Sequence, residues 1–156
     1  MRIGVISDTH GYLDPAVLRL FAGVDRILHA GDIGDVAVIR ALEAVAPVAA
    51  VRGNVDEGRP AGQAFPPHRD LTLGGRRVHL VHRLQDARPA LEAEILVYGH
   101  THTPESHEED GRLYLNPGAA GRRGFHRERT VALLELTDGR PEVRIIPLGP
   151  RTGGER

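Results

Sequence analysis

The side chains best suited to chemistry in this sequence are histidines, carboxylates and one amide that follow short apolar runs. The clearest case is Gly99-His100-Thr101-His102, which comes directly after the apolar run 94–98. In an extended backbone, residues at i and i+2 point to the same side, so both imidazoles can reach one point in space. Imidazole, carboxylate and amide oxygen are all metal ligands. The candidate ligands of this kind are Asp8, His10, Asp32, Asn54, His82, His100 and His102.

Strands must carry these side chains to one place. Five apolar runs of strand length precede the candidate ligands. A strand-helix-strand connection is right-handed and parallel, so the carboxyl ends of such strands meet at one edge. Open α/β sheets bind ligands at that edge, and we therefore expect the seven groups to gather there. The predicted strands are residues 2–6, 25–30, 47–51, 77–81 and 95–98.

Seven such groups are too many for one ion and suit two. The sequence has no cysteine, so nitrogen and oxygen must hold any metal. We expect two divalent cations, with Mn²⁺ favoured and Fe²⁺, Co²⁺, Ni²⁺ and Zn²⁺ left open. A carboxylate such as Asp32 could bridge ions about 3.5–4 Å apart, the spacing used for in-line displacement at phosphorus.

The other local signals describe a single domain over residues 1–150, followed by a loose tail at 151–156. Two aspartates have the positions of helix N-caps: Asp14 precedes Pro15, and Asp35 precedes an apolar stretch. For Asp35, the role of N-cap is the first interpretation and that of metal ligand is the second. Gly74-Gly75 indicates a hairpin. Further predicted elements are a short helix at 87–93 and strands at 112–115, 130–136 and 143–147.

Composition narrows the class of protein. The 156 residues are 40% hydrophobic and 26% charged, with a net charge of −1, as in an ordinary globular protein. The basic residues are all arginines and are spread along the chain, so no clustered nucleic-acid footprint is visible. No apolar run approaches the roughly 20 residues of a membrane span, and Met1-Arg2 leads straight into a strand rather than a signal peptide. We expect a cytoplasmic protein; a homo-oligomer is left open.

In order along the chain, these motifs resemble those of the calcineurin-like metallophosphoesterases, and in particular the small YfcE-like phosphodiesterases, which are related to Vps29. The resemblance implies a four-layer αββα sandwich with two mixed sheets. It also implies that Asp8, His10, Asp32 and His102 hold one ion and that Asp32, Asn54, His82 and His100 hold the other. The motifs that carry the resemblance are Asp8-Thr9-His10, Gly31-Asp32-Ile33-Gly34-Asp35, Gly53-Asn54-Val55-Asp56, His82 and Gly99-His100-Thr101-His102.

Three residues depart from the family pattern. Arg83 stands where glycine is common, Ala119 replaces a serine, and Val55 replaces a histidine that donates a proton to the leaving group in larger members. This leaves the general acid unassigned. Asp56 is a candidate, although a structural role is the better interpretation, and a good leaving group needs little protonation.

The remaining polar residues have simpler interpretations. His29 and His79 lie inside predicted strands, where they pack or support the site, and His29 could orient Asp32. His68, His107 and His126 lie in polar loops and are expected to be solvated. Arg123 is a candidate contact for a phosphate group.

The sequence thus predicts a metal-dependent phosphoesterase. The leading hypothesis is a phosphodiesterase in which a hydroxide bridging two metals attacks phosphorus in line, acting on a small phosphodiester substrate. The alternatives are a phosphomonoesterase or nucleotidase and, from another class, a non-catalytic Vps29-like scaffold that binds proteins. A scaffold should tolerate the loss of ligands, and this sequence retains all seven.

Overall fold

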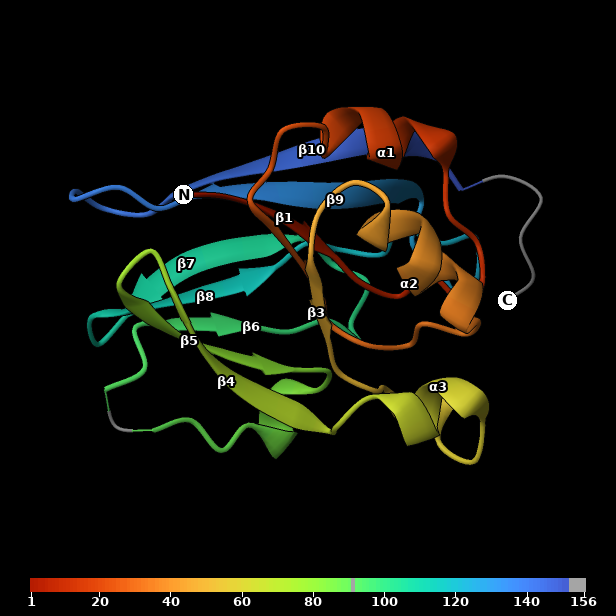
Figure 1. Cartoon of the computed structure of the whole chain (residues 1–156), viewed down its shortest axis with the longest axis horizontal. Helices are drawn as coiled ribbons and strands as arrows, with labels where there is room; N and C mark the ends of the chain where they lie inside the picture. Colours follow the sequence, from red (N-terminus) through yellow and green to blue (C-terminus); the bar gives the residue numbers. More distant parts are fainter. Residues whose placement is uncertain (91, 152–156) are drawn as a thin grey trace.

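Two five-stranded mixed sheets lie face to face in the computed structural model, which describes residues 1–90 and 92–151 (Figure 1). The first sheet has the order β10-β9-β1-β2-β3, in which β1, β2 and β3 are parallel and β9 and β10 run antiparallel to their neighbours. Its strands are β1 (Arg2–Ile6), β2 (Arg26–His29), β3 (Val48–Ala50), β9 (Glu128–Glu135) and β10 (Glu142–Pro150).

The second sheet has the order β4-β5-β6-β8-β7, with β5, β6 and β8 parallel. Its strands are β4 (His68–Leu73), β5 (Arg76–Val81), β6 (Ile95–Val97), β7 (Glu105–Glu109) and β8 (Arg112–Asn116). The hairpin predicted at Gly74-Gly75 joins β4 to β5. Strand β7 was not predicted because its sequence, Glu-Ser-His-Glu-Glu, has no apolar face; it is an edge strand that pairs with β8 alone.

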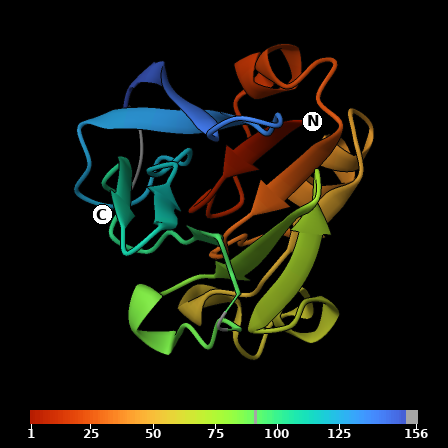
Figure 2. The ribbon, with the colours of Figure 1, turned by 90° about the vertical axis from the view of Figure 1, so that its left-hand side faces the viewer.

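Two capped helices cover the outer face of the first sheet (Figure 2). Helix α1 (Pro15–Leu20) and helix α2 (Val36–Glu43) begin as predicted, because the side chains of Asp14 and Asp35 each accept a hydrogen bond from a backbone N–H two residues on. The shorter helices are α3 (Pro60–Ala64) and the 3₁₀ turns η1 (Asn54–Asp56) and η2 (Leu84–Asp86).

Three apolar clusters separate the layers. The largest lies between the sheets, where Val5 faces residues such as Leu80 and Val97. A second lies between α1, α2 and the first sheet and includes Phe21 and Leu42. A third, of Val81, Leu96 and Tyr98, lies on the outer face of the second sheet. The αββα layering implied by the resemblance is therefore present, with only a thin layer over the second sheet.

The helix predicted at 87–93 is wrong over its described residues, because residues 87–90 and 92–93 are not helical and residue 91 lies outside the described part of the chain. Pro89 lacks the N–H that a helix interior needs. The N–H of Arg88 donates instead to Nε2 of His79, at 3.1 Å. The segment is fixed by a tertiary contact that apolar spacing does not reveal.

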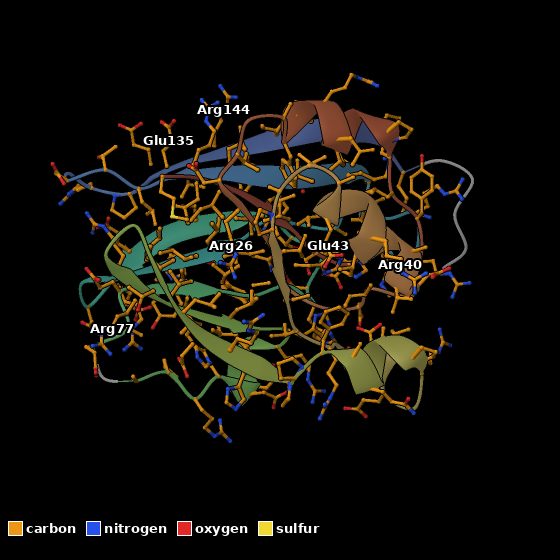
Figure 3. The ribbon with its side chains drawn as sticks, viewed as in Figure 1. Arg26, Arg40, Glu43, Arg77, Glu135 and Arg144 are labelled. Carbon is orange, nitrogen blue, oxygen red and sulfur yellow. The ribbon has the colours of Figure 1, made fainter. Side chains whose placement is uncertain are left out.

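Charged side chains such as Arg40, Glu43, Arg77 and Arg144 lie on the outside of this sandwich (Figure 3). Within the described ranges, no helix is long and apolar enough to cross a membrane. The carboxyl ends of β1, β2 and β3 meet those of β5 and β6 at one edge, where Asp8 N–H donates to Gly31 O at 3.0 Å and Gly99 N–H to His82 O at 2.9 Å. This edge positions the predicted ligands.

Candidate metal centre

The backbone turns sharply where the predicted ligands leave their strands. Left-handed φ angles are uncommon for residues other than glycine and cluster at functional sites. The extended i, i+2 geometry expected for the pairs Asp8/His10 and His100/His102 is therefore wrong, because the backbone of these four residues is left-handed instead of continuing the strand. The ligands with left-handed φ are Asp8 (55°), His10 (46°), Asp32 (53°), His100 (71°) and His102 (61°).

One group of ligand atoms comes from Asp8, His10 and His102, whose side chains could together hold an ion. Nε2 of His102 lies 3.1 Å from Oδ1 of Asp8. Nε2 of His10 lies 4.0 Å from the same oxygen and 3.6 Å from Oδ2 of Asp32. This His10 nitrogen is buried and has no hydrogen-bond partner. A cation is the partner that would satisfy it.

A second group comes from Asp32, His82 and His100. Nε2 of His82 lies 3.3 Å from Oδ2 of Asp32 and 3.1 Å from Oδ1 of Asn54. The rings of His82 and His100 meet edge to face with centroids 5.1 Å apart. Oδ2 of Asp32 thus faces one histidine from each group. The structure brings all seven predicted ligands together.

The protonation of His82 shows why these groups fit a metal. Its Nδ1 lies 2.7 Å from Ala30 O, which can only accept, so Nδ1 carries a proton. The lone pair of Nε2 in the neutral ring then faces two acceptor oxygens, those of Asp32 and Asn54. Such an arrangement is unfavourable unless a positive charge lies among the acceptors. Histidine, carboxylate and amide donors suit divalent transition metals.

The pKa values of the predicted ligands are shifted because these side chains are buried close to one another. Burial raises the pKa of Asp8, but the close contact with His102 and the charges of His82 and His102 outweigh it, and the pKa falls to about 2. Burial lowers the pKa of His82, but the hydrogen bond and charge of Asp32 outweigh it, so that this pKa is raised: without a metal, a proton on Nε2 supplies the positive charge that the facing acceptors favour. Burial raises the pKa of Asp32, but the hydrogen bond and charge of His82 outweigh it, so that this pKa is also lowered. Asp8 and Asp32 therefore stay ionised near neutral pH, as metal ligands must.

Asp56 braces the site rather than acting in it. Its side chain is fully buried, and its carboxylate accepts from Gly53 N at 2.8 Å, Ile33 N at 3.1 Å and Gly34 N at 2.9 Å. These three bonds tie the turn after β2 to the turn after β3. This geometry agrees with the structural role predicted for Asp56. Both of its carboxylate oxygens accept hydrogen bonds from backbone N–H groups, so the side chain is not placed to give a proton to a leaving group.

Close backbone approach requires glycine at two points around the ligands. A Cβ at Gly53 would lie 2.2 Å from Oδ1 of Asp32, and a Cβ at Gly99 would lie 2.0 Å from Oγ of Ser7. The Ser7 hydroxyl donates to Oδ2 of Asp8 at 2.6 Å, and His100 N–H donates to the same oxygen at 3.1 Å. These bonds leave Oδ1 of Asp8 directed at the imidazoles.

Asn116 is a supporting residue that sequence reasoning missed. It is fully buried, and its Nδ2 donates to Gly99 O at 3.2 Å and to Oγ1 of Thr101 at 2.9 Å. It therefore holds the turn that carries His100 and His102. The available signal was its position before Pro117-Gly118, which the sequence analysis did not interpret as part of the site.

One possibility considered for His29 and the expectation for His126 are wrong. His29 is buried inside β2, as predicted, but it does not orient Asp32: its Nε2 lies 3.0 Å from the Thr9 hydroxyl, and its Nδ1 accepts from Gly31 N at 3.2 Å. His126 was expected to be solvated, but its ring lies against His102 with centroids 4.9 Å apart. Polar loop composition does not reveal that the loop folds back onto a ligand.

A third cluster of similar residue types, His68, Asp70 and His79, does not have the chemistry of a metal site. Nδ1 of His79 lies 2.8 Å from Oδ1 of Asp70, while Nε2 accepts from Arg88 N at 3.1 Å. Nδ1 therefore carries the proton and donates it to Asp70. Both nitrogens of His79 have complementary partners, and a metal at Nδ1 would force a proton onto Nε2, against the N–H of Arg88.

The three residues that depart from the family pattern each have a defined place in the structure. Arg83 has a φ of −108°, which any residue adopts, and its Nε donates to Asp86 at 2.8 Å. Val55 contributes its N–H, which donates to Oδ1 of Asp32 at 3.0 Å. Ala119 is fully buried, and its carbonyl accepts from Thr130 N at 3.0 Å.

The two arginines near the centre differ. Arg122 stacks on the ring of Tyr12, 3.9 Å from its centroid. The positive charge of Arg123 is close enough to contribute, after burial, to the lowered pKa of His10.

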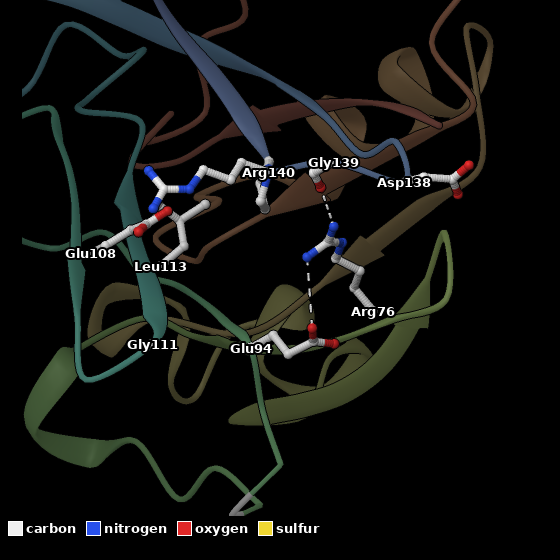
Figure 4. A pocket seen from close by; sticks show the side chains of 9 residues that line it. Arg76, Glu94, Glu108, Gly111, Leu113, Asp138, Gly139 and Arg140 are labelled. Carbon is white, nitrogen blue, oxygen red and sulfur yellow. Dashed lines mark hydrogen bonds and ion pairs between the residues drawn. The ribbon is translucent and has the colours of Figure 1, made fainter.

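Cavities lie at both ends of the strands, and one of about 410 Å³ is lined by His102 and His126, among others. A cavity of about 150 Å³ beside the candidate centre is lined by Asn54, His82 and Arg83, among others. A larger one of about 350 Å³ lies at the other end, between Arg76, Glu94 and the β9–β10 turn (Figure 4).

The chain matches known proteins of one family. The calcineurin-like phosphoesterase superfamily domain matches residues 1–139. A probable metallophosphoesterase of Methanothermobacter thermautotrophicus is 37% identical over 76% of this chain and 77% of its own. The phosphodiesterase YfcE of Escherichia coli is 33% identical over 76% of this chain and 79% of its own.

Among solved structures, a novel archaeal phosphodiesterase superposes with a TM-score of 0.81 at 25% identity, covering 95% of this chain and all of the other. A single mutant of Vps29 from Entamoeba histolytica superposes with a TM-score of 0.75 at 22% identity, covering 96% of this chain and all of the other. The second likeness concerns the fold alone.

Proposed function

Because this chain belongs to the calcineurin-like phosphoesterase superfamily, we propose that it is a metal-dependent phosphodiesterase that holds two divalent cations. The observation that supports this most directly is the buried cluster in which histidine lone pairs and carboxylate oxygens face one another. One ion would lie among Asp8, His10, Asp32 and His102. The other would lie among Asp32, Asn54, His82 and His100, and Mn²⁺ is the favoured metal.

The chain's own groups would prepare the site for hydrolysis. When bound, the two cations supply a water that ionises near neutral pH and a positive field at phosphorus. Asp32, which faces both groups, would bridge them, and its Oδ1 is held by Val55 N–H. Ser7 holds the carboxylate of Asp8, and Asp56 holds the turns after β2 and β3, both through buried hydrogen bonds. Little rearrangement is therefore needed when the substrate binds.

The charges around the centre support a diester rather than a monoester. A diester carries one negative charge at neutral pH, and a monoester carries up to two. Arg83 lines the adjacent cavity, but the carboxylate of Asp86 balances its charge at 2.8 Å. Arg122 is stacked on Tyr12. Arg123 is the proposed contact with the phosphate group of a small phosphodiester, because it lies in the loop that Gly121 N–H joins to Asp8 O.

The test is hydrolysis of bis-p-nitrophenyl phosphate and p-nitrophenyl phosphate by the purified protein, with metal content measured beforehand. We expect about two Mn²⁺ per chain and a higher kcat/KM for the diester. Asp32→Asn should lose both metal and activity. The matched control Asp70→Asn, in the third cluster, should keep both.

A protein that binds no metal would contradict the proposal. So would one that hydrolyses only the monoester. Folded, metal-loaded protein without hydrolytic activity on either ester would instead favour a binding scaffold.

A further inference from the structure

The loop of residues 121–127 places a histidine ring against one of the proposed ligands. Nδ1 of His126 lies 3.1 Å from Nδ1 of His102, and Nε2 of His126 lies 2.9 Å from Gly121 O. His102 uses its other nitrogen, Nε2, to face Oδ1 of Asp8 at 3.1 Å. The imidazole of His126 is thus in contact with the ligand on the side away from the ions.

These contacts fix the position of the protons. A carbonyl oxygen only accepts, so Nε2 of His126 carries a proton and donates it to Gly121 O. The neutral ring of His126 then offers a lone pair at Nδ1. A hydrogen bond between the two Nδ1 atoms needs one proton, which His102 must supply. Nε2 is therefore the nitrogen of His102 that is left for a metal.

We infer that His126 is a positioning residue that holds His102 with Nδ1 protonated and Nε2 directed at the metal. Metal-bound histidines usually donate their second N–H to a carboxylate or a carbonyl, and this partner fixes the tautomer and the ring orientation. Here a second histidine takes that place. The inference rests on the proposed metal centre but does not depend on which ester is hydrolysed.

The surrounding loop holds His126 in place from both sides. Gly121 N–H donates to Asp8 O at 3.0 Å, so the carbonyl that anchors His126 belongs to a residue bonded to a ligand turn. Nε of Arg151 donates to His126 O at 2.9 Å. Gly124 allows the ring contact, because a Cβ there would lie 2.3 Å from Nδ1 of His102.

Two amide variants separate the two bonds of His126. The Asn side chain reaches about as far as Nδ1 of histidine, so His126→Asn should keep an acceptor for His102. The Gln side chain reaches about as far as Nε2, so His126→Gln should keep the bond to Gly121 O and lose the acceptor. His126→Ala removes both, and His107→Ala, on the exposed strand β7, is the matched control.

The first measurement is Mn²⁺ affinity by titration calorimetry on metal-free protein. His126→Ala and His126→Gln should weaken binding of one ion about 10- to 100-fold, as for other groups that orient ligands. His126→Asn and His107→Ala should stay within about threefold of the wild type. Equal affinity in the wild type and His126→Gln would overturn the inference.

The second measurement needs neither activity nor metal. Long-range ¹H–¹⁵N correlation spectra of metal-free protein at pH 8 should show His102 in the Nδ1–H tautomer, and His126→Gln should shift it toward a mixture. A His102 in the Nε2–H tautomer in the wild type would refute the role of His126. If the protein bound no metal but kept this tautomer, the proposed function would fail while the positioning by His126 stood.

Discussion

The two ends of the β-sandwich contain similar side chains in opposite circumstances. At the carboxyl ends of β1, β2 and β5, the buried side chains of Asp8, Asp32 and His82 face one another, with acceptors against acceptors. At the starting ends of β5 and β6, Arg76 pairs with the half-exposed Glu94 at 3.7 Å and also donates to Gly139 O (Figure 4). The polar groups at the carboxyl ends lack complementary partners, whereas those at the starting ends are paired.

This difference shows which observations identify a site. Cavity size does not distinguish the two ends: the cavity at the starting ends is about 350 Å³, and those at the other end are about 150 Å³ beside His82 and about 410 Å³ beside His102. The charges at the starting ends are already paired in contact with solvent. Exposed ion pairs of this kind contribute little to stability. Left-handed φ at non-glycine residues also occurs mainly at the other end, with Asp110 in a β-turn as the exception. Unsatisfied acceptors and backbone strain are the better guides here.

The assignment of the metal site to one end is tested most directly by neutralising one carboxylate at each end. Asp8→Asn should lower metal-dependent kcat/KM for bis-p-nitrophenyl phosphate by at least about 10³-fold, because metal catalysis supplies several kcal/mol. Glu94→Gln should change it less than about twofold, since its half-exposed side chain contacts only Arg76 and the backbone N–H of Arg77 among the described residues, far from the predicted ligands. Cooperative urea unfolding of both variants is the control for folding. A loss of activity in Glu94→Gln, or its retention in Asp8→Asn, would reverse the assignment of the two ends.

The buried His29, close to the predicted ligands, should make the free energy of unfolding depend on pH in the acid range. Burial lowers the pKa of His29 to about 4 from the 6.5 of the unfolded chain. The unfolded chain takes up this proton first as the pH falls, so the stabilisation is complete above 6.5 and is lost as the pH falls to about 4. The expected loss is about 3 kcal/mol.

The measurement is urea unfolding of metal-free protein between pH 7 and pH 4. His29→Gln should flatten the pH dependence of the unfolding free energy by about that amount, whereas His107→Gln should leave it unchanged. The lowered pKa values of His10 and His100 contribute with the same sign, so the wild-type slope includes them. An identical slope in His29→Gln and the wild type would contradict a buried neutral His29.

The smallest expected effect concerns substrate contact. Arg123→Gln should raise KM for the diester about tenfold with kcat nearly unchanged, because one charge-assisted hydrogen bond to phosphate is worth about 1.5 kcal/mol. Arg140→Gln, in the cavity at the starting ends, should leave KM unchanged. Steady-state kinetics on the same diester distinguishes them. A large drop in kcat for Arg123→Gln would show instead that this arginine supports the metal ligands.

The strands and the residues at their carboxyl ends could be predicted from the sequence, because buried strands leave apolar runs that end in unusual polar residues. Strand β1 was predicted at its observed bounds, Arg2–Ile6. Strand β7 could not be found, since backbone pairing with β8 leaves no apolar pattern.

The surroundings of the ligands were harder to predict. Asn116 and His126 contact the turn that carries His100 and His102 from 15 to 24 positions away in the sequence, so no local spacing reveals them. The left-handed turns were missed because i, i+2 spacing is compatible with both straight and bent backbone. The predicted tail at 151–156 is described only at Arg151, which is bonded to the 121–127 loop; residues 152–156 lie outside the described part of the chain.

The left-handed turns have an evolutionary consequence. Among residues with a side chain, asparagine and aspartate adopt such φ values most readily, and glycine adopts them without penalty. Replacing His10, His100 or His102 by Asn or Gly would therefore relieve backbone strain while removing an imidazole. A descendant of this chain could lose its chemistry in single steps that leave the sandwich intact, and its surface would then be available for other uses.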